Sequence, residues 1–367
     1  MKLKKILFSD NTLWGLLNFR RGVIEYMIRS GFEVVLVAPT DPMCDLKDLP
    51  NGAKYISVEL SRTGTNVFSD LAYYKALRRI YKTERPDYIF HYTIKPNIYG
   101  TLAAKSFGIR SSAMVAGLGH VYTEGGVGNA IARSMYKYAM RYPQKVLVLN
   151  RANYDTLLAQ KVVSKSKLVW LEGGEGIDLS KFGPQPMPSN ERPVFLMICR
   201  LLYEKGYAEY VAAAEALHGQ AEFRIMGSID SHPSAVGREV IEADVTRGII
   251  KYIGFSPDVL SQVAQTDCIV LPSYHEGLSR VLMEGLAVGR PIITTDIAGC
   301  RETVRDGENG FLCAPKDAAS LIEACRRFLA LSPEQRVRMS NQSRKLAERV
   351  FDEQSVIQTY LELTASV

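Results

Sequence analysis

Short apolar runs alternate with longer amphipathic stretches along the whole chain, and this alternation constrains the fold more than any other feature. Strands that alternate with helices predict βαβ units and a parallel, doubly wound sheet. The runs have the length and composition of buried strands; they are KKILFS, FEVVLVAP, DYIFHY, SAMVAG and KVLVLN in the first half, and VFLMICR, AEFRIMG, IIKYIGF, DCIVLPS, PIITTD and GFLCAP in the second. The sequence therefore predicts two α/β domains, each with its own Rossmann-like sheet.

The length of 367 residues suits two domains of ordinary size. Between the two sets of strands lies GPQPMPSNERP, whose closely spaced prolines indicate an exposed linker. We expect an N-terminal domain over 1–182, a linker over 183–193, a C-terminal domain over 194–348, and a last helix within 349–367 that returns to the first domain. Because open parallel sheets bind ligands beyond the carboxyl ends of their strands, two such domains facing each other predict a ligand cleft.

The composition restricts the expected cellular location of the protein and the classes of partner it could bind. No apolar stretch is long enough to span a membrane, and the apolar run Ile6–Phe8 is too short for the core of a signal peptide. The six cysteines are scattered without a CxxC pair, which predicts free thiols in the cytoplasm and no zinc site. Residues 1–182 carry 26 Lys and Arg against 15 Asp and Glu, whereas the remainder carries 19 against 24. This asymmetry suits a nucleic acid, an anionic membrane or a pyrophosphate-bearing substrate, and incidental surface charge explains it equally well.

The most informative stretch is residues 268–312. A buried strand ends at Leu271, and a turn through Gly277 leads into a helix that begins near Ser279. The amides of Gly277, Leu278 and Ser279 are predicted to form an anion site, because the first amides of a helix lack intrahelical acceptors and the helix dipole favours negative charge there.

Charged side chains surround this turn. Glu276 precedes the helix and Glu284 lies in its early turns, so we expect one carboxylate near sugar hydroxyls and the other on a ribose diol. Arg200 and Lys205 follow the strand VFLMICR, where two cations suit a diphosphate. Each residue taken alone has a plainer interpretation as a turn, helix or surface residue, and the set as a whole favours a site.

The C-terminal half resembles the retaining family-4 glycosyltransferases of the glycosyltransferase-B fold. Besides the residues above, the resemblance includes Gly254, Asp258, Asp267, Gly289-Arg290-Pro291, the turn from Gly299 to Glu302, Asp306-Gly307 and Asn309-Gly310-Phe311, all in family order. It implies that Arg200, Lys205 and the turn amides hold a nucleotide pyrophosphate, that Glu284 holds the ribose, and that Glu276 lies by the donor sugar. Gly227 and Gly254, at the ends of two strands, are also predicted to bind the donor.

The N-terminal half is similar to bacterial GalNAc and Gal transferases that extend saccharides linked to undecaprenyl pyrophosphate. The resemblance is carried by LNFRRG at 17–22, Arg62 in LSRTGTN, TIKPNIYG at 93–100, GLG at 117–119, Gly-Ile-Asp at 176–178 and a helix over 351–364. It implies acceptor binding by Lys95, Asn97, Arg20 and Arg62. Pro96 should hold Lys95 in a loop rather than a helix, and the alternative is a surface lysine. His120 is a further catalytic candidate, or it only supports the residues that touch the sugar.

The predicted reaction is a retaining transfer of a hexose or N-acetylhexosamine from a UDP-sugar to a lipid-pyrophosphate-linked saccharide. The departing diphosphate would take the acceptor proton while cations stabilise its charge. Neither half carries a DxD motif or a ligand cluster, so we expect no metal and no cofactor. The alternatives are a sugar-nucleotide epimerase, which needs no acceptor surface, and a non-catalytic nucleotide-sugar-binding partner. A nucleic-acid enzyme is a distant fourth, because no RNA-binding motif is present.

A helical stretch in the basic half suggests where a membrane could bind. In NAIARSMYKYAMRYPQK, Met135, Tyr138 and Tyr142 recur at spacings of three and four, beside a row of Arg133, Lys137 and Arg141. Such a helix can lie at a headgroup boundary, so we expect a peripheral protein at the cytoplasmic face of the inner membrane. The alternative is that this apolar row belongs to the core.

Overall fold

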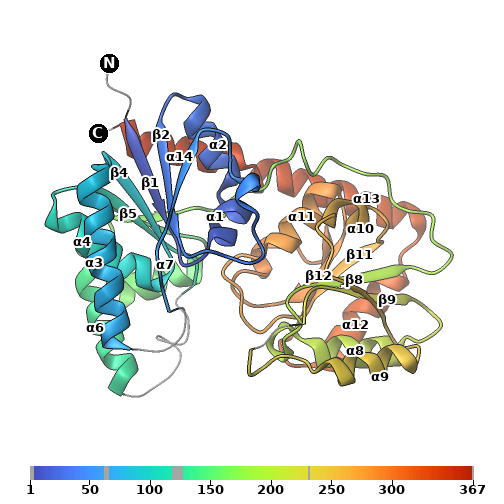
Figure 1. The fold of residues 1–367 in the computed structure, drawn as a ribbon. Coiled ribbons are helices and arrows are strands. Elements are labelled where there is room, and N and C mark those ends of the chain that lie inside the picture. The colour runs from blue at the N-terminus through green and yellow to red at the C-terminus, as the bar shows by residue number, and fades with distance from the viewer. Residues whose placement is uncertain (1–3, 62–65, 118–126, 230–231, 366–367) are drawn as a thin grey trace. The chain divides into compact units, whose positions relative to one another are not determined.

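The computed structural model describes residues 4–61, 66–117, 127–229 and 232–365. The chain divides into two compact units, each with a parallel sheet at its centre (Figure 1). Unit 1 comprises Met1–Glu175 and Glu353–Val367, and unit 2 comprises Gly176–Asp352. The prediction of two Rossmann-like α/β domains is confirmed.

Unit 1 contains a seven-stranded sheet in the order β3-β2-β1-β4-β5-β6-β7, with every neighbouring pair parallel. The strands are β1 (Lys5–Ser9), β2 (Glu33–Ala38), β3 (Ala53–Ser57), β4 (Tyr88–Tyr92), β5 (Arg110–Val115), β6 (Lys145–Val148) and β7 (Leu168–Trp170). The five predicted strands are all present and occupy the middle of the sheet. Strands β3 and β7 were not predicted, and both lie at an edge, where one side has no neighbour and the apolar signal is weak.

Both faces of this sheet are covered, as a parallel sheet requires. The helical segments of unit 1 are α1 (Leu13–Phe19), α2 (Arg21–Arg29), η1 (Leu46–Asp48), α3 (Val67–Glu84), η2 (Pro96–Gly100), α4 (Thr101–Ser106), α6 (Val127–Ala139), α7 (Arg151–Ala159) and α14 (Glu353–Ala365). Helix α14 comes from the C-terminal end of the chain and lies beside α2 (Figure 1). On one face, the ring of Tyr360 packs 4.5 Å from that of Phe90, measured between centroids. On the other face, α3 and α4 pack on Leu7 and Ile89.

Unit 2 contains a six-stranded parallel sheet in the order β10-β9-β8-β11-β12-β13. The strands are β8 (Val194–Ile198), β9 (Glu222–Met226), β10 (Lys251–Gly254), β11 (Cys268–Leu271), β12 (Ile292–Thr295) and β13 (Gly310–Cys313). The helical segments are η3 (Tyr203–Lys205), α8 (Tyr207–Ala216), α9 (Arg238–Thr246), α10 (Val259–Ala264), α11 (Arg280–Val288), η4 (Arg301–Thr303), α12 (Ala318–Leu329), α13 (Pro333–Leu346) and η5 (Ala347–Phe351). All six predicted strands are present. Strands β8, β11 and β12 are buried throughout, whereas the edge strand β10 is partly exposed.

The boundaries between the units differ from the expected ones. The first crossing lies at Glu175–Gly176 and the second at Asp352–Glu353. The proline-rich segment 183–193, expected to be an exposed linker between the domains, is largely exposed but belongs to unit 2 and is hydrogen-bonded to it. The amide of Gln185 donates to the carbonyl of Val288 (3.0 Å), and the buried guanidinium of Arg290 donates to the carbonyls of Gln185 and Pro186 (3.0 and 2.8 Å). These hydrogen bonds attach the segment to the end of α11 and to Arg290, which follows that helix.

Candidate donor and acceptor sites

The predicted donor residues Lys205 and Glu276 meet at the carboxyl ends of β8 and β11. Two backbone features bring their loops together. Gly206 has φ +82°, and a Cβ there would lie 2.2 Å from the carbonyl oxygen of Pro272, so only glycine permits this approach. The amide of Tyr274 donates to the carbonyl of Glu204 (2.9 Å). The loops after β8 and β11 therefore pack against each other, which fixes the backbone positions of Lys205 and Glu276.

Lys205 and Glu276 form an ion pair at this edge. The Nζ atom lies 2.8 Å from Oε1 of Glu276, and both side chains are less than one-fifth exposed. Burial acts to lower the pKa of Lys205, and the Glu276 carboxylate outweighs it, so the pKa lies above its ordinary value and the amine stays charged. The positive charge of Arg200 also acts on Lys205. Two cations and one carboxylate thus share a small, partly buried region that suits a phosphate group beside sugar hydroxyls.

The helix expected near Ser279 is confirmed, and the prediction for its amide is wrong. Ser279 is the N-cap of α11, but its amide donates to the carbonyl of Gly299 (3.0 Å) and is not available to an anion. Gly299 has φ +86°, and a Cβ there would lie 2.6 Å from the carbonyl oxygen of Glu276. The turn from Gly299 to Glu302 therefore packs directly against the loop 276–279. By helix geometry, the amides available to an anion are those of the first turn of α11.

Glu284 is a buried carboxylate that forms an ion pair with Arg280, one turn earlier on α11. The Nε atom of Arg280 lies 3.0 Å from Oε1 of Glu284, whose side chain is 8% exposed. Burial raises the pKa of Glu284, and the Arg280 charge partly offsets this. The alternative of a solvated helix residue does not hold. A buried carboxylate on α11 can accept hydrogen bonds from two hydroxyl groups, which suits the predicted ribose contact.

Several glycosyltransferase-like motif residues of unit 2 have structural contacts. Arg290 is fully buried and donates to five backbone carbonyls, including those of Val263 and Ala264. Asp267 accepts from the amide of Val194 (2.8 Å). Gly227 has a carbonyl neighbour, because a Cβ there would lie 1.8 Å from the oxygen of Cys199. Close packing thus accounts for Gly227, whereas Gly254, with φ +83°, has open space where a Cβ would be.

Unit 1 has a cavity of about 240 Å³ at the carboxyl ends of β4 and β5. Lys95 and Asn97, both predicted to bind the acceptor, line it together with Asn11, Thr93 and Tyr136. The side-chain amide of Asn97 is buried and donates to the carbonyl of Met114 (2.8 Å). Its Oδ1 has no hydrogen-bond partner among the described residues, which leaves an acceptor atom for a bound molecule.

The backbone of Lys95 differs from the prediction. Lys95 has α-helical dihedrals (φ −70°, ψ −45°) despite the proline after it, and it leads into the wide helical turn η2. Its Nζ pairs with Asp70 on α3 (2.7 Å), and the Tyr99 hydroxyl donates to the other oxygen of the same carboxylate (2.9 Å). The pair is mostly buried, so Lys95 is an oriented cation at the wall of the cavity and not a mobile surface lysine.

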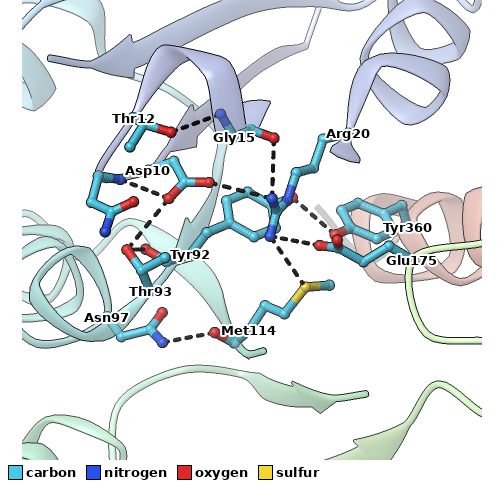
Figure 2. A network of polar contacts seen from close by, with 11 residues as sticks. Asp10, Thr12, Gly15, Arg20, Tyr92, Thr93, Asn97, Met114, Glu175 and Tyr360 are labelled. Atoms are coloured by element: carbon cyan, nitrogen blue, oxygen red, sulfur yellow. Dashed lines mark hydrogen bonds and ion pairs between the residues drawn. The ribbon is translucent and has the colours of Figure 1, made fainter. Parts of the chain in front are cut away.

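Arg20 lies in a buried polar network instead of lining this cavity (Figure 2). Its guanidinium pairs with Glu175 (2.5 Å) and Asp10 (3.5 Å) and stacks 4.3 Å from the centroid of the Tyr92 ring. The hydroxyl of Tyr92 in turn lies 2.9 Å from that of Tyr360 on α14. Because Arg20 is 4% exposed, it does not contact an acceptor directly, and this prediction is corrected. Its charge holds together segments next to both chain crossings.

Sequence reasoning missed Asp10 and Thr93, which link this network to the cavity. Asp10 Oδ1 accepts from the amide of Asn11 (2.7 Å) and from the hydroxyl of Thr93 (3.3 Å). Thr93 has φ +66°, an unfavourable conformation for a β-branched residue, and such strain is often found at functional sites. Asp10 could have been predicted, because it directly follows the buried strand KILFS, and open parallel sheets bind ligands beyond the carboxyl ends of their strands.

Two predicted residues, His120 and Arg62, lie outside the described residues, so their positions are not part of this site description. Among the residues that the structure describes, no group of three or more His, Cys, Asp or Glu side chains is placed to hold a metal ion. Within the same described ranges, no helix is long and apolar enough to cross a membrane.

Of the apolar row that the sequence singled out, Met135 and Tyr138 lie on α6, whereas Tyr142 follows the end of that helix and is partly buried. Met135 and Tyr138 are 37% and 47% exposed, and Ile131, one turn earlier, is 57% exposed. The side of α6 that faces the core carries Tyr136 and Ala139 instead. The alternative that the Met135–Tyr138 row belongs to the core is therefore wrong, and the row forms a stripe on the surface of unit 1.

Comparisons with known proteins identify the relatives of both units. A family profile described as "Glycosyl transferase 4-like" matches residues 5–150, and one described as "Glycosyl transferases group 1" matches residues 182–346. A curated relative from Campylobacter jejuni is 28% identical over 98% of this chain and 98% of its own. Its description is "N,N'-diacetylbacillosaminyl-diphospho-undecaprenol alpha-1,3-N-acetylgalactosaminyltransferase".

Solved structures match the fold over nearly the whole chain. A glycosyltransferase from Rickettsia africae has a TM-score of 0.82 at 19% identity, covering 99% of this chain and 98% of its own. The Anabaena protein HepE, solved with UDP and glucose, has a TM-score of 0.79 at 18% identity, covering 99% of this chain and 100% of its own. At this level of identity the likeness shows the fold, and the function rests on the profiles and the curated relative.

Proposed function

Because this chain is a glycosyltransferase of the glycosyltransferase-B fold, we propose that it transfers a hexose or N-acetylhexosamine from a UDP-sugar to a saccharide carried on a polyprenyl pyrophosphate. The observation that carries the proposal is the end-to-end similarity to a transferase described as acting on an undecaprenol diphosphate-linked sugar. The arrangement of charged residues in each unit supports it.

Unit 2 is proposed to bind the donor. Glu284 accepts the ribose hydroxyls, and the first-turn amides of α11 with Lys205 and Arg200 hold the diphosphate. Glu276 is placed to accept a hydroxyl of the donor sugar. Glu276 also pairs with Lys205 at 2.8 Å. A bound diphosphate would share Lys205 with this carboxylate, so the ion pair keeps the lysine charged and oriented until the donor arrives.

The proposed chemistry is a transfer with retention of configuration. The bond between the anomeric carbon and the donor phosphate oxygen breaks, and a bond from the same carbon to the acceptor hydroxyl oxygen forms on the same face. The acceptor proton passes to the departing diphosphate. Lys205 and Arg200 stabilise the charge that develops on this leaving group, so the reaction is proposed to need no metal ion and no cofactor.

Unit 1 is proposed to bind the acceptor at the cavity beside Lys95 and Asn97. Lys95 offers a cation oriented by Asp70, which suits a pyrophosphate. Asn97 offers the unpartnered Oδ1 noted above, which suits a sugar hydroxyl. These two groups fit the two chemical parts of a pyrophosphate-linked saccharide.

A lipid-linked acceptor implies work at a membrane surface, and the stripe Ile131, Met135 and Tyr138 on α6 is proposed as the docking face at the cytoplasmic side. Exposed apolar side chains flanked by basic residues favour an anionic headgroup boundary. The excess of Lys and Arg in residues 1–182 acts in the same direction.

The discriminating experiment measures UDP release from a panel of UDP-sugars with and without an undecaprenyl-pyrophosphate-linked saccharide. A transferase consumes one donor rapidly only when the lipid-linked acceptor is present. An epimerase would convert the donor without acceptor, and a non-catalytic partner would bind UDP without turnover in either case. Either of these results contradicts the proposal.

A further inference from the structure

A second cavity in unit 1 has no part in the proposed reaction. Its volume is about 440 Å³, and it lies beside α4 and the first residues of β5, Arg110 and Ser111. The cavity beside Lys95 lies by Met114 and Val115, at the other end of the same strand. Because the reaction uses the carboxyl ends of the strands, this second cavity needs another explanation.

Its buried part is polar and incompletely bonded. Thr101, the first residue of α4, is fully buried and lines the cavity, and its Oγ1 has no hydrogen-bond partner within the described part of the chain. The buried Oε1 of Gln144, which also lines the cavity, has none there either. Rotation of the amide would present its NH₂ group instead. An unpaired buried polar group is costly, so a ligand with hydrogen-bonding oxygens would satisfy both side chains.

Two cations line the same cavity. The Nζ of Lys105 lies 3.7 Å from the centroid of the Tyr142 ring and 5.8 Å from that of Tyr138 on α6. Arg110 supplies the second charge at the start of β5. Among the described residues that line the cavity, none is acidic. Donors and positive charge without a carboxylate favour an oxyanion such as phosphate.

Exposed apolar side chains stand near the cavity. Phe107, which directly precedes the cavity residue Gly108, is 38% exposed, and Arg78 stacks on its ring at 5.4 Å. Tyr138 links the cavity to the stripe on α6, because Lys105 contacts both its ring and that of Tyr142. Aromatic and cationic side chains together suit the boundary between headgroups and acyl chains. The apolar surroundings favour a phosphate ligand that carries acyl chains over a water-soluble phosphate compound.

We propose that this cavity binds the phosphate of an anionic phospholipid headgroup, with the acyl chains along the stripe Ile131, Met135 and Tyr138. Lys105, Arg110 and the hydroxyl of Thr101 contact the phosphate oxygens. The inference rests on the proposed membrane docking, and it adds a specific lipid site to it. It accounts for a buried hydroxyl without a partner, for two clustered cations and for the aromatic surroundings with one ligand.

The test is co-sedimentation of the full chain with vesicles, in the absence of any UDP-sugar. Vesicles of phosphatidylcholine alone are compared with vesicles that also contain phosphatidylglycerol. The variants are Lys105→Gln with Arg110→Gln, and Thr101→Val, which removes the hydroxyl at nearly constant volume. The matched control is Arg29→Gln with Lys47→Gln, which removes the same charge from the β2–β3 side of the sheet.

We expect wild-type protein to prefer the anionic vesicles. The Lys105 and Arg110 double variant should lose about thirtyfold in partitioning, from about fivefold per basic residue. Thr101→Val should lose at least about threefold without a lower unfolding temperature, as expected for one lost hydrogen bond. The Arg29 and Lys47 control should change less than the cavity variant.

Equal losses in the cavity variant and the control would show a diffuse charge effect and overturn the proposal. So would an unchanged affinity in Thr101→Val. Competition by glycerol phosphate without any preference for anionic vesicles would assign the cavity to a water-soluble phosphate compound and also overturn it. Turnover of a short-chain acceptor analogue is measured separately, so a failure of the proposed reaction is recognised independently of vesicle binding.

Discussion

Replacement of Arg280 by Met should change the pH dependence of UDP binding. Arg280 forms an ion pair with the buried Glu284 carboxylate, at 3.0 Å. Burial raises the pKa of Glu284, and the charges of Arg280 and Lys181 oppose that shift. Without the Arg280 guanidinium only the weaker effect of Lys181 opposes burial, so the pKa of Glu284 should rise further. The proposed ribose contact needs the ionised carboxylate, because a protonated one accepts fewer hydrogen bonds.

The size of this pKa effect follows from the energy of the hydrogen bond between Arg280 and Glu284. A hydrogen bond to a charged group contributes about 1.5–3 kcal/mol, and one pKa unit corresponds to about 1.4 kcal/mol. In Arg280→Met the ionised carboxylate should therefore lose about 1.5–3 kcal/mol of stabilisation, which raises the pKa of Glu284 further. UDP affinity falls as the pH drops through that pKa, so the variant should begin to lose affinity at a higher pH than the wild type.

Calorimetric titration of UDP between pH 5 and pH 8 measures this directly. Arg238→Met serves as the matched control, because Arg238 is exposed and pairs with Glu242 at the same i,i+4 spacing on α9 of unit 2. Glu284→Gln, alone and combined with Arg280→Met, should abolish the pH-dependent part. If Arg280→Met weakens UDP binding by the same factor at every pH, Arg280 acts on the ligand directly and the reasoning fails.

Three further predictions concern the other parts of the two sites. Lys205→Ala and Arg200→Ala should each lower kcat/KM about thirtyfold to a thousandfold, since each removes a cation from the leaving diphosphate. The assay contains EDTA, and near-normal rates in the variants or loss of wild-type activity on chelation would exclude this role. Lys95→Ala and Asn97→Ala should raise KM for the lipid-linked acceptor about tenfold or more with UDP affinity unchanged, and an equal loss of UDP affinity would contradict the assignment to the acceptor. Arg20→Met should lower the free energy of unfolding by about 3–5 kcal/mol, because two buried carboxylates lose their cation. Chemical denaturation measures this, and a loss no larger than that of the exposed control Arg29→Met would disprove the role of the network.

The central strands of both sheets could be predicted because they are buried on two sides. Parallel strands such as β4 and β11 read as continuous apolar runs. The edge strand β3, AKYIS, has two exposed and no fully buried residues, and β7 has only three residues, so neither has such a signal. Unit boundaries were also harder to predict, because the proline-rich segment packs through its backbone carbonyls, which no side-chain pattern reveals.

The candidate donor residues were predictable because charged side chains directly follow buried strands. What the sequence did not reveal depends on contacts between distant segments. The Ser279 amide is occupied by Gly299, which belongs to the turn after β12. Arg20 is buried by Glu175 and by aromatic residues of β4 and α14. Each partner lies far along the chain, and local spacing carries no information about it.

Product analysis tests the central claim most directly. Purified protein is incubated in EDTA with the preferred UDP-sugar and an undecaprenyl-pyrophosphate-linked saccharide, and the glycolipid is examined by mass spectrometry and NMR. The account predicts a mass increase of one hexose or one N-acetylhexosamine, with the new linkage in the α configuration of the donor. A product with inverted configuration, or release of free sugar and UDP without any extended glycolipid, would contradict it.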